Sequence, residues 1–265
     1  GNGAAGPTFD ELESLLASTT NKLSFVKVHH MPDSSFPNGI PNPLLSKNHR
    51  ENKDLTVKAG ANLGIAFDGD FDRCFFFDEN GNFISGQYIV GLLAETFLLK
   101  EPGAKIIHDP RVIWNIQNVI EKNGGIAIKS KTGHAFIKQS MRDNTALYGG
   151  EISAHHYFRD FFYCDSGMIP WLLIIELMGR TGKTLSELVA VQKTMFPSSG
   201  EINFQLADPG HSIEKVVSHY SGEFLSKEEF DGLTLTFDAW RLNLRCSNTE
   251  PVSYTHLTLP TNREV

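Results

Sequence analysis

Short apolar runs alternate with amphipathic segments of helical length through most of the chain. Runs at 63–67 and Cys74–Phe77 have strand length and β-prone residues, with a polar stretch between them. Apolar spacing over 9–16 and over Gly86–Lys100 is typical of helices. The further predicted strands are 23–29, 105–109, 126–129 and 146–148, and the further predicted helices are 51–60, 112–123, 134–142, 166–178 and 184–193. This alternation predicts α/β structure, with a largely parallel sheet between residues 83 and 196.

The pattern changes beyond residue 196. Strands are predicted at 202–205, 234–237 and 240–245 with a helix near 212–220, which is typical of a small α+β domain. The predicted fold class is therefore α/β, with mixed-sheet domains followed by an incomplete α+β domain. The predicted boundaries are 1–82, 83–196 and 197–251, with a separate segment at 252–265.

Composition and charge narrow the possible functions. The 265 residues are 40% hydrophobic and 21% charged, and the net charge is −7 without any run of Lys or Arg. This balance argues against a nucleic-acid or anionic-membrane surface. Three widely spaced cysteines without a C-x-x-C pair indicate reduced thiols. The reduced thiols predict a cytoplasmic protein, and the longest apolar stretches are too short to span a bilayer.

The polar stretch between the runs 63–67 and Cys74–Phe77 is acidic. Asp68, Asp70 and Asp72 alternate with Gly69 and Phe71, and Arg73 follows directly. A tight loop between strands would bring the three carboxylates together, and such oxygen ligands suit Mg²⁺. Arg73 could hold a phosphate or carboxylate through two hydrogen bonds. The alternative is an ordinary acidic turn that Arg73 neutralises.

Two further polar clusters follow predicted strands. Lys131 and His134 lie where a predicted strand meets a predicted helix, and a helix start attracts anions. The alternative is that they are incidental charges on an exposed loop. Glu151, Ser153 and His155 lie just past a strand end, where α/β proteins bind ligands. Glu151 and Ser153 could bind sugar hydroxyls, and His155 could relay a proton. In the alternative interpretation Glu151 caps a helix and His155 fills a gap.

A third cluster follows the last predicted strand. Its side chains are an arginine, two hydroxyls and an amide within one turn, and such donors can bind a phosphate without a metal. A plain β-turn is the alternative. The residues are Arg245, Ser247, Asn248 and Thr249.

Together these motifs resemble the α-D-phosphohexomutase superfamily, and the resemblance extends from residue 1 to residue 251. The stretch 68–73 resembles the family's metal loop, in which glycine is usual where Phe71 stands here. The stretch 151–155 resembles the sugar-binding loop, commonly Gly-Glu-Met-Ser-Gly-His, and 245–251 resembles the phosphate-binding loop of the last domain. The versions here are most similar to those of bacterial phosphomannomutases. The resemblance assigns 1–82 to part of domain II, 83–196 to domain III and 197–251 to part of domain IV.

The resemblance implies a reaction and its residues. Mannose 6-phosphate and mannose 1-phosphate would interconvert through a phosphoserine and a hexose bisphosphate, supplying nucleotide-sugar synthesis. Mg²⁺ would be held by Asp68, Asp70 and Asp72, and Arg73, His155 and Arg111 would be catalytic. The resemblance further implies that eight other residues bind substrate: Lys131, His134, Glu151, Ser153, Arg245, Ser247, Asn248 and Thr249.

Two departures from the family pattern lead to further expectations. No stretch resembles the phosphoserine loop, typically Thr-Ala-Ser-His-Asn-Pro, so we expect a fragment that is inactive without that domain. Residues 252–261 match what one reading frame of a common sequencing adapter would encode, so 252–265 is interpreted as a non-native tail. The alternative is a genuine strand, which the alternation of Tyr254, His256, Leu257 and Leu259 permits.

Three other functions stay open. The first is phosphoglucomutase or dual-specificity activity, because the choice between sugar epimers cannot be read from these loops. The second is a phosphosugar- and Mg²⁺-binding fragment without turnover. The third is a haloacid-dehalogenase-type phosphatase, because Asp68-Gly69-Asp70 after an apolar strand resembles the nucleophile motif of that family. That family has Thr or Val where Asp72-Arg73 stands here. Oligomeric state is not predicted.

Overall fold

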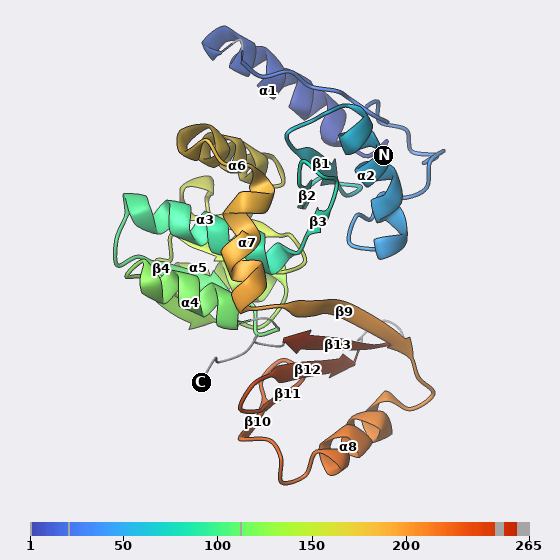
Figure 1. The fold of residues 1–265 in the computed structure, drawn as a ribbon, viewed down its shortest axis with the longest axis vertical. Coiled ribbons are helices and arrows are strands. Elements are labelled where there is room, and N and C mark those ends of the chain that lie inside the picture. The colour runs from blue at the N-terminus through green and yellow to red at the C-terminus, as the bar shows by residue number, and fades with distance from the viewer. Residues whose placement is uncertain (1, 21, 112, 247–251, 259–265) are drawn as a thin grey trace.

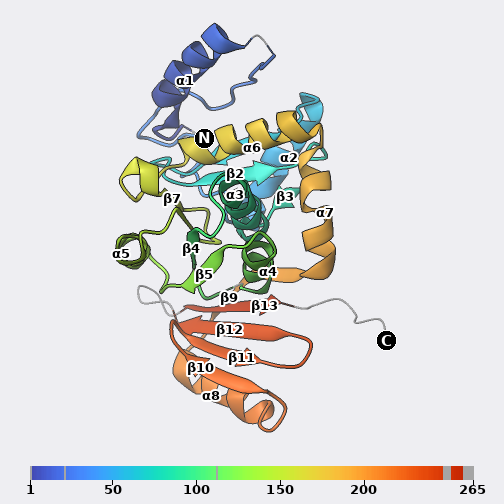
Figure 2. The same ribbon diagram turned by 90° about the vertical axis from the view of Figure 1, so that its left-hand side faces the viewer.

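The structure, a computed structural model, describes residues 2–20, 22–111, 113–246 and 252–258. Three sheets follow one another along the described part of the chain (Figure 1), with strand orders β1-β2-β3, β5-β4-β6-β7-β8 and β10-β11-β12-β13-β9. Helices cover the first two sheets, and Figure 2 shows the C-terminal sheet below the central helices α3 and α4. The mixed α/β architecture agrees with the predicted fold class.

The N-terminal part combines two helices with a small antiparallel sheet. Its elements are α1 (Ala5–Thr19), a 3₁₀ turn (Ser46–Asn48), α2 (His49–Lys58), β1 (Gly64–Phe67), β2 (Cys74–Phe77) and β3 (Phe83–Ile84). The predicted strand at 23–29 is wrong, because no described segment pairs with this stretch as a ladder. Side-chain packing holds it instead: the Phe25 ring lies 5.1 Å from that of Phe9 and 6.0 Å from that of Trp171.

The central part is a five-stranded sheet with helices around it. Its elements are α3 (Gly86–Lys100), β4 (Lys105–His108), α4 (Trp114–Lys122), β5 (Ile126–Lys129), α5 (His134–Asn144), β6 (Tyr148–Gly150), β7 (His156–Phe158), a 3₁₀ turn (Arg159–Phe161), β8 (Cys164–Asp165), α6 (Met168–Thr181) and α7 (Leu185–Met195). Strands β5, β4 and β6 are parallel, as the alternating pattern predicts. Strands β7 and β8 run antiparallel, so the sheet is mixed. Neither had been predicted, because two- and three-residue strands leave no clear period in the sequence.

The C-terminal part is an antiparallel sheet with one helix. Its elements are β9 (Ser198–Gln205), α8 (Pro209–His219), β10 (Ser226–Glu229), β11 (Leu233–Thr236), β12 (Arg241–Cys246) and β13 (Val252–Thr258). The backbone of β13 pairs with β12 on one side and β9 on the other. Residues 252–258 therefore adopt the strand that the alternative interpretation permits, while their origin outside the native protein stays a prediction.

The main core lies around α3, which is buried along nearly its whole length. Ile89, Leu93 and Trp171 are each at most 1% exposed within this core, and Phe9 packs against it from α1. A separate small core lies between α8 and the C-terminal sheet. Among the described residues, no helix is long and apolar enough to cross a membrane.

Candidate functional site

The acidic loop connects two paired strands. Phe67 and Cys74 are the last partners of the β1–β2 ladder, so residues 68–73 form the turn between them. Carboxylate oxygens of Asp68, Asp70 and Asp72 lie within 4.8 Å of one another. Phe71 has a φ of +55°, a conformation in which glycine is normally favoured. The convergence of three carboxylates, predicted from their spacing, is thus present in the structure and suits a hard divalent cation.

The negative charge of this loop is partly neutralised by an arginine of the loop itself. Arg73 Nε donates to Asp68 Oδ2 at 2.6 Å and lies 3.7 Å from Asp72 Oδ1. Burial raises the pKa of Asp68, which is 2% exposed, even though Arg73 lies beside it. A contact with His155 lowers the pKa of Asp72. Arg73 therefore neutralises part of the loop, as the alternative interpretation expects, and its role toward phosphate stays a prediction.

Two glycines allow the backbone of neighbouring segments to pack closely against the acidic loop. The Ala4 N–H donates to the Gly69 carbonyl at 2.9 Å, and a Cβ on Gly3 would lie 2.7 Å from that oxygen. On the other side, a Cβ on Gly167, just before α6, would lie 2.5 Å from the Phe71 carbonyl oxygen. Backbone from α1 and α6 therefore reaches the loop more closely than any side chain would permit.

The second predicted loop, 151–155, directly contacts the acidic loop. It joins β6 to β7, and Ala154 within it has a φ of +73°. Arg73 and His155 form an antiparallel bridge, and the Cys74 N–H donates to the Ala154 carbonyl at 3.4 Å. His155 Nε2 lies 3.5 Å from Asp72 Oδ2. Ser153 Oγ contacts His155 Nδ1 at 3.2 Å. The structure thus brings together residues about 80 positions apart.

Glu151 is 1% exposed and its carboxylate is surrounded by donors. Tyr157 O–H donates to Oε1 at 2.6 Å, and the Gly133 N–H, at the start of α5, donates to Oε2 at 3.0 Å. Burial and the neighbouring Glu151 raise the pKa of Tyr157, which keeps it a donor. These contacts match the alternative in which Glu151 caps a helix. Its predicted binding of sugar hydroxyls stays a prediction.

Arg111 also reaches this cluster. Its Nη2 lies 2.7 Å from Asp109 Oδ2 and 3.8 Å from Glu151 Oε2, while Nη1 lies 3.8 Å from Glu201 Oε2. Burial would raise the pKa of Asp109, but the Arg111 guanidinium and donated N–H groups hold it below its ordinary value. The structure therefore places Arg111 next to Glu151.

Lys131 lies exposed on the loop before α5, and His134 is the exposed first residue of that helix. The backbone N–H groups between them are occupied by carboxylates of the protein: Thr132 N–H donates to Asp231 Oδ2 at 2.8 Å, and Gly133 N–H donates to Glu151. A helix start favours such anions. Binding of a substrate anion by Lys131 and His134 stays a prediction.

Arg245, near the end of β12, lies with its Nε 3.5 Å from Asp231 Oδ1. Asp231 therefore bridges Arg245 and the Thr132 loop. The other three residues predicted to bind phosphate, Ser247, Asn248 and Thr249, lie outside the described residues.

The sequence prediction missed several residues of this cluster. Asp109 accepts the Ile152 N–H at 2.8 Å and is fully buried, so it supports the backbone of the 151–155 loop. Its position at the end of a parallel strand was a usable signal. Glu201, Tyr157 and Asp231 carried no local signal, because their roles depend on contacts made across domains or strands.

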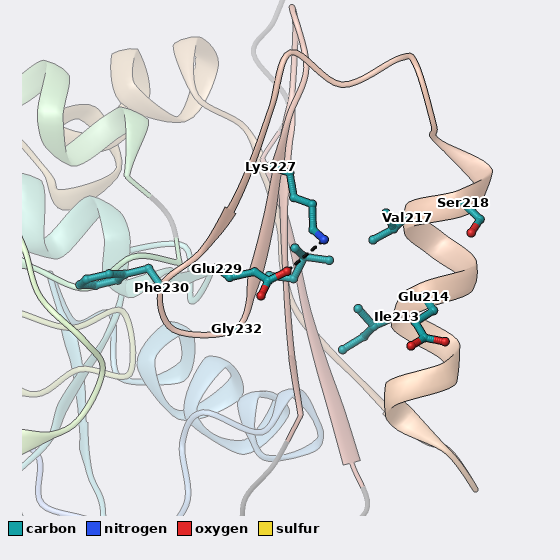
Figure 3. Close-up of a pocket in the computed structure, with 9 residues that line it drawn as sticks. Ile213, Glu214, Val217, Ser218, Lys227, Glu229, Phe230 and Gly232 are labelled. Atoms are coloured by element: carbon teal, nitrogen blue, oxygen red, sulfur yellow. Dashed lines mark ion pairs between the residues drawn. The ribbon is translucent and has the colours of Figure 1, made fainter.

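A separate hollow of about 800 Å³ lies between α8 and β10 (Figure 3). Ile213 and Val217 of α8 face Lys227 and Glu229 of β10, which form an ion pair at 3.0 Å. None of the predicted site residues within the described ranges lines this hollow. Those predicted residues that the structure brings together lie instead where the acidic loop meets the 151–155 loop.

An acidic loop whose carboxylates could hold a cation thus meets a loop of the next α/β domain that carries a carboxylate and an imidazole, an arrangement typical of the phosphohexomutase class. The chain belongs to the phosphoglucomutase/phosphomannomutase family: residues 1–81 match its α/β/α domain II and residues 85–195 match its α/β/α domain III. This confirms the family and the fold class inferred from the motifs.

Individual relatives agree. The chain is 58% identical over 252 residues to a phosphomannomutase of Escherichia coli K12, and 56% identical over 253 residues to one of Vibrio cholerae O1. Each comparison covers 95% of this chain and 55% of the relative, so the chain spans about half the length of the curated relatives it matches.

Solved structures show the same fold. A phosphoglucomutase/phosphomannomutase family protein from Burkholderia thailandensis superposes with a TM-score of 0.83 at 27% identity, covering 98% of this chain and 55% of that chain. The phosphoglucomutase parafusin from Paramecium superposes with a TM-score of 0.74 at 18% identity, covering 96% of this chain and 51% of that one. The second likeness concerns the fold alone.

Proposed function

We propose that these residues hold the metal and the phosphosugar in a phosphomannomutase, which interconverts mannose 6-phosphate and mannose 1-phosphate in the cytoplasm. The observation that carries the proposal is the direct contact between the acidic loop and the 151–155 loop, through the Arg73–His155 bridge and the Asp72–His155 contact of 3.5 Å. The names of the bacterial relatives support mannose phosphate as the substrate. The phosphoserine would come from a segment outside the 265 residues.

The acidic loop fits Mg²⁺, because its three carboxylates converge and offer only oxygen ligands. Asp68, Asp70 and Asp72 would hold the ion. When bound, Mg²⁺ supplies positive charge that offsets the charge developing on a transferred phosphoryl group. Arg73 adds a fixed positive charge at the edge of the loop.

His155 is the residue best placed to move a proton, since its imidazole lies between Asp72 and the carboxylate of Glu151, at 3.5 Å and 3.8 Å. Ser153, on the same loop, presents its hydroxyl beside that imidazole. Arg111 provides a second positive charge, with its Nη2 3.8 Å from Glu151 Oε2.

The remaining predicted residues would bind the substrate at its two ends. Lys131, on the loop before α5, and His134, the first residue of α5, are both exposed beside the Gly133 N–H that donates to Glu151. Arg245 presents a guanidinium from the C-terminal sheet, and with Ser247, Asn248 and Thr249 it would hold the phosphate that does not react.

A second candidate is a mutase that accepts both mannose and glucose phosphates. Two Xanthomonas campestris relatives, 53% identical over 256 residues, are named phosphohexose mutases rather than phosphomannomutases. The contacts of the 151–155 loop do not distinguish the two sugars.

The test is turnover of mannose 1-phosphate with Mg²⁺ and a trace of hexose bisphosphate. It is measured on the chain alone and on a fusion carrying the phosphoserine domain of the E. coli relative ahead of Gly1. We expect turnover only in the fusion, and its loss on Asp70→Asn, because Asp70 is an exposed ligand whose replacement leaves the core unchanged. A folded fusion that binds neither Mg²⁺ nor mannose phosphate would contradict the proposal, and equal rates with glucose 1-phosphate would favour the dual-specificity candidate.

A further inference from the structure

One face of β12 is polar and buried. Side chains alternate along a strand, so Arg241, Asn243 and Arg245 share a face, while Leu242 and Leu244 belong to the small core that packs against α8. Arg241 and Asn243 are each 2% exposed. Figure 3 shows α8 on one side of the C-terminal sheet and the central part of the protein on the other. The polar face is therefore the one turned toward the central part.

Arg241 donates hydrogen bonds across that junction. Nη1 donates to the Arg111 carbonyl at 2.6 Å, and Nη2 donates to the Pro110 carbonyl at 3.1 Å and to Thr234 Oγ1 at 3.4 Å. Burial lowers the pKa of Arg241 to about 10, and the nearby charges of Glu228 and Asp109 offset only part of that effect. A buried guanidinium is costly unless its N–H groups are hydrogen-bonded, and the Arg111 and Pro110 carbonyls supply two of those bonds.

The two carbonyls belong to the turn that carries Arg111 into the candidate site. That turn follows β4 directly, and its Arg111 N–H donates to Asp109 Oδ1 at 2.9 Å. The Arg111 guanidinium lies within 3.8 Å of carboxylate oxygens of Glu151 and Glu201. The same residue is therefore held through its backbone by Arg241 and points its side chain at Glu151.

We propose that Arg241 is a positioning residue: it fixes the 109–111 turn so that Arg111 is placed against Glu151, and it thereby couples the C-terminal sheet to the sugar-binding loop. The part of this proposal that concerns substrate binding rests on the function proposed above. Arg241 also lies four residues before Arg245 on the same face of β12. Anchoring one end of this face against the 109–111 turn sets the distance between Arg245 and the sugar-binding loop.

The first test needs no ligand. Hydrogen–deuterium exchange is measured on the full chain for peptides covering 105–111, 64–77 and 233–244. Arg241→Met should raise exchange at 105–111 and leave 64–77 unchanged. Leu235→Ala is the matched control, because Leu235 is fully buried in the same sheet and belongs to the small core beneath α8. It should raise exchange at 233–244 only. Equal exchange at 105–111 in Arg241→Met and unmodified chain overturns the proposal.

The second test asks whether Arg241 acts through Arg111. Mannose 6-phosphate affinity is measured for the unmodified chain, Arg241→Met, Arg111→Met and the double variant, at a temperature where all four are folded. We expect Arg241→Met to weaken binding about tenfold in the unmodified background and to have no further effect beside Arg111→Met. Leu235→Ala should leave the affinity unchanged.

The outcomes separate the two proposals. Additive losses in the double variant, or the same loss in Leu235→Ala, would mean that Arg241 contributes only stability, and the positioning role would be wrong. If the unmodified chain binds no mannose 6-phosphate, the proposed function fails, and the exchange result alone decides whether Arg241 positions the turn.

Discussion

Gly167 lies immediately before α6, where backbone of that helix meets the acidic loop. An ideal Cβ at this position would lie 2.5 Å from the Phe71 carbonyl oxygen and 3.0 Å from the Arg73 carbonyl oxygen. Both contacts are with backbone atoms, which cannot rotate away as a side chain could. Gly167→Ala should therefore displace the loop that carries Asp70 and Asp72.

The size of the effect follows from this geometry. Gly167 has φ −80° and ψ −16°, which alanine adopts without strain, so the whole effect is steric. Relieving the 2.5 Å contact requires the loop to move by roughly half an ångström, and overpacking of this kind costs about 1–3 kcal/mol. A movement of this size also disturbs the arrangement of three carboxylates, so we expect weaker Mg²⁺ binding as well as lower stability.

The assay is urea unfolding with and without Mg²⁺. Gly179→Ala is the matched control, because Gly179 lies in the same helix and its Cβ would meet no atom within 4 Å. The control should be unchanged or more stable by up to about 1 kcal/mol. If Gly167→Ala unfolds at the same urea concentration as Gly179→Ala, and Mg²⁺ stabilises both equally, the steric reasoning is refuted.

Two further predictions concern stability. Thr145 follows the last residue of α5 with a φ of +51° and an exposed side chain. Thr145→Gly should therefore raise the free energy of unfolding by about 1 kcal/mol, and Thr145→Ala should raise it by less. Equal urea midpoints for the two variants would contradict this. Burial lowers the pKa of His156 to about 3, below its unfolded value of about 6.5. Between these two values the unfolded chain binds more protons than the folded chain. The free energy of unfolding should therefore fall as the pH decreases from about 6.5 toward 3. Thermal unfolding between pH 6.5 and 5 should show a shallower loss in His156→Gln, with a remaining slope from buried His108, whose pKa is also lowered; an unchanged slope would be evidence against the assignment.

Local pattern was sufficient for much of the fold and for the chemistry of the acidic loop. The helix Gly86–Lys100 was predicted with its observed bounds, because a long apolar helix is visible from its composition and spacing. The three aspartates were predicted to converge because a turn between paired strands leaves them no room to spread. The strand expected at 23–29 failed because a strand needs a partner, and pairing is a property of the whole sheet.

Contacts between residues far apart in the chain lie beyond such patterns. Nothing near Arg241 in the sequence indicates that its guanidinium reaches the Arg111 carbonyl, 130 residues away. The same holds for the pairing of Asp72 with His155 and for the approach of Gly167 to the Phe71 carbonyl. The residue types that a site requires can be recognised in short stretches of sequence, because the chemistry of the site determines them. Their distances arise from packing of whole domains, which sums many weak contacts and so cannot be read from any one segment.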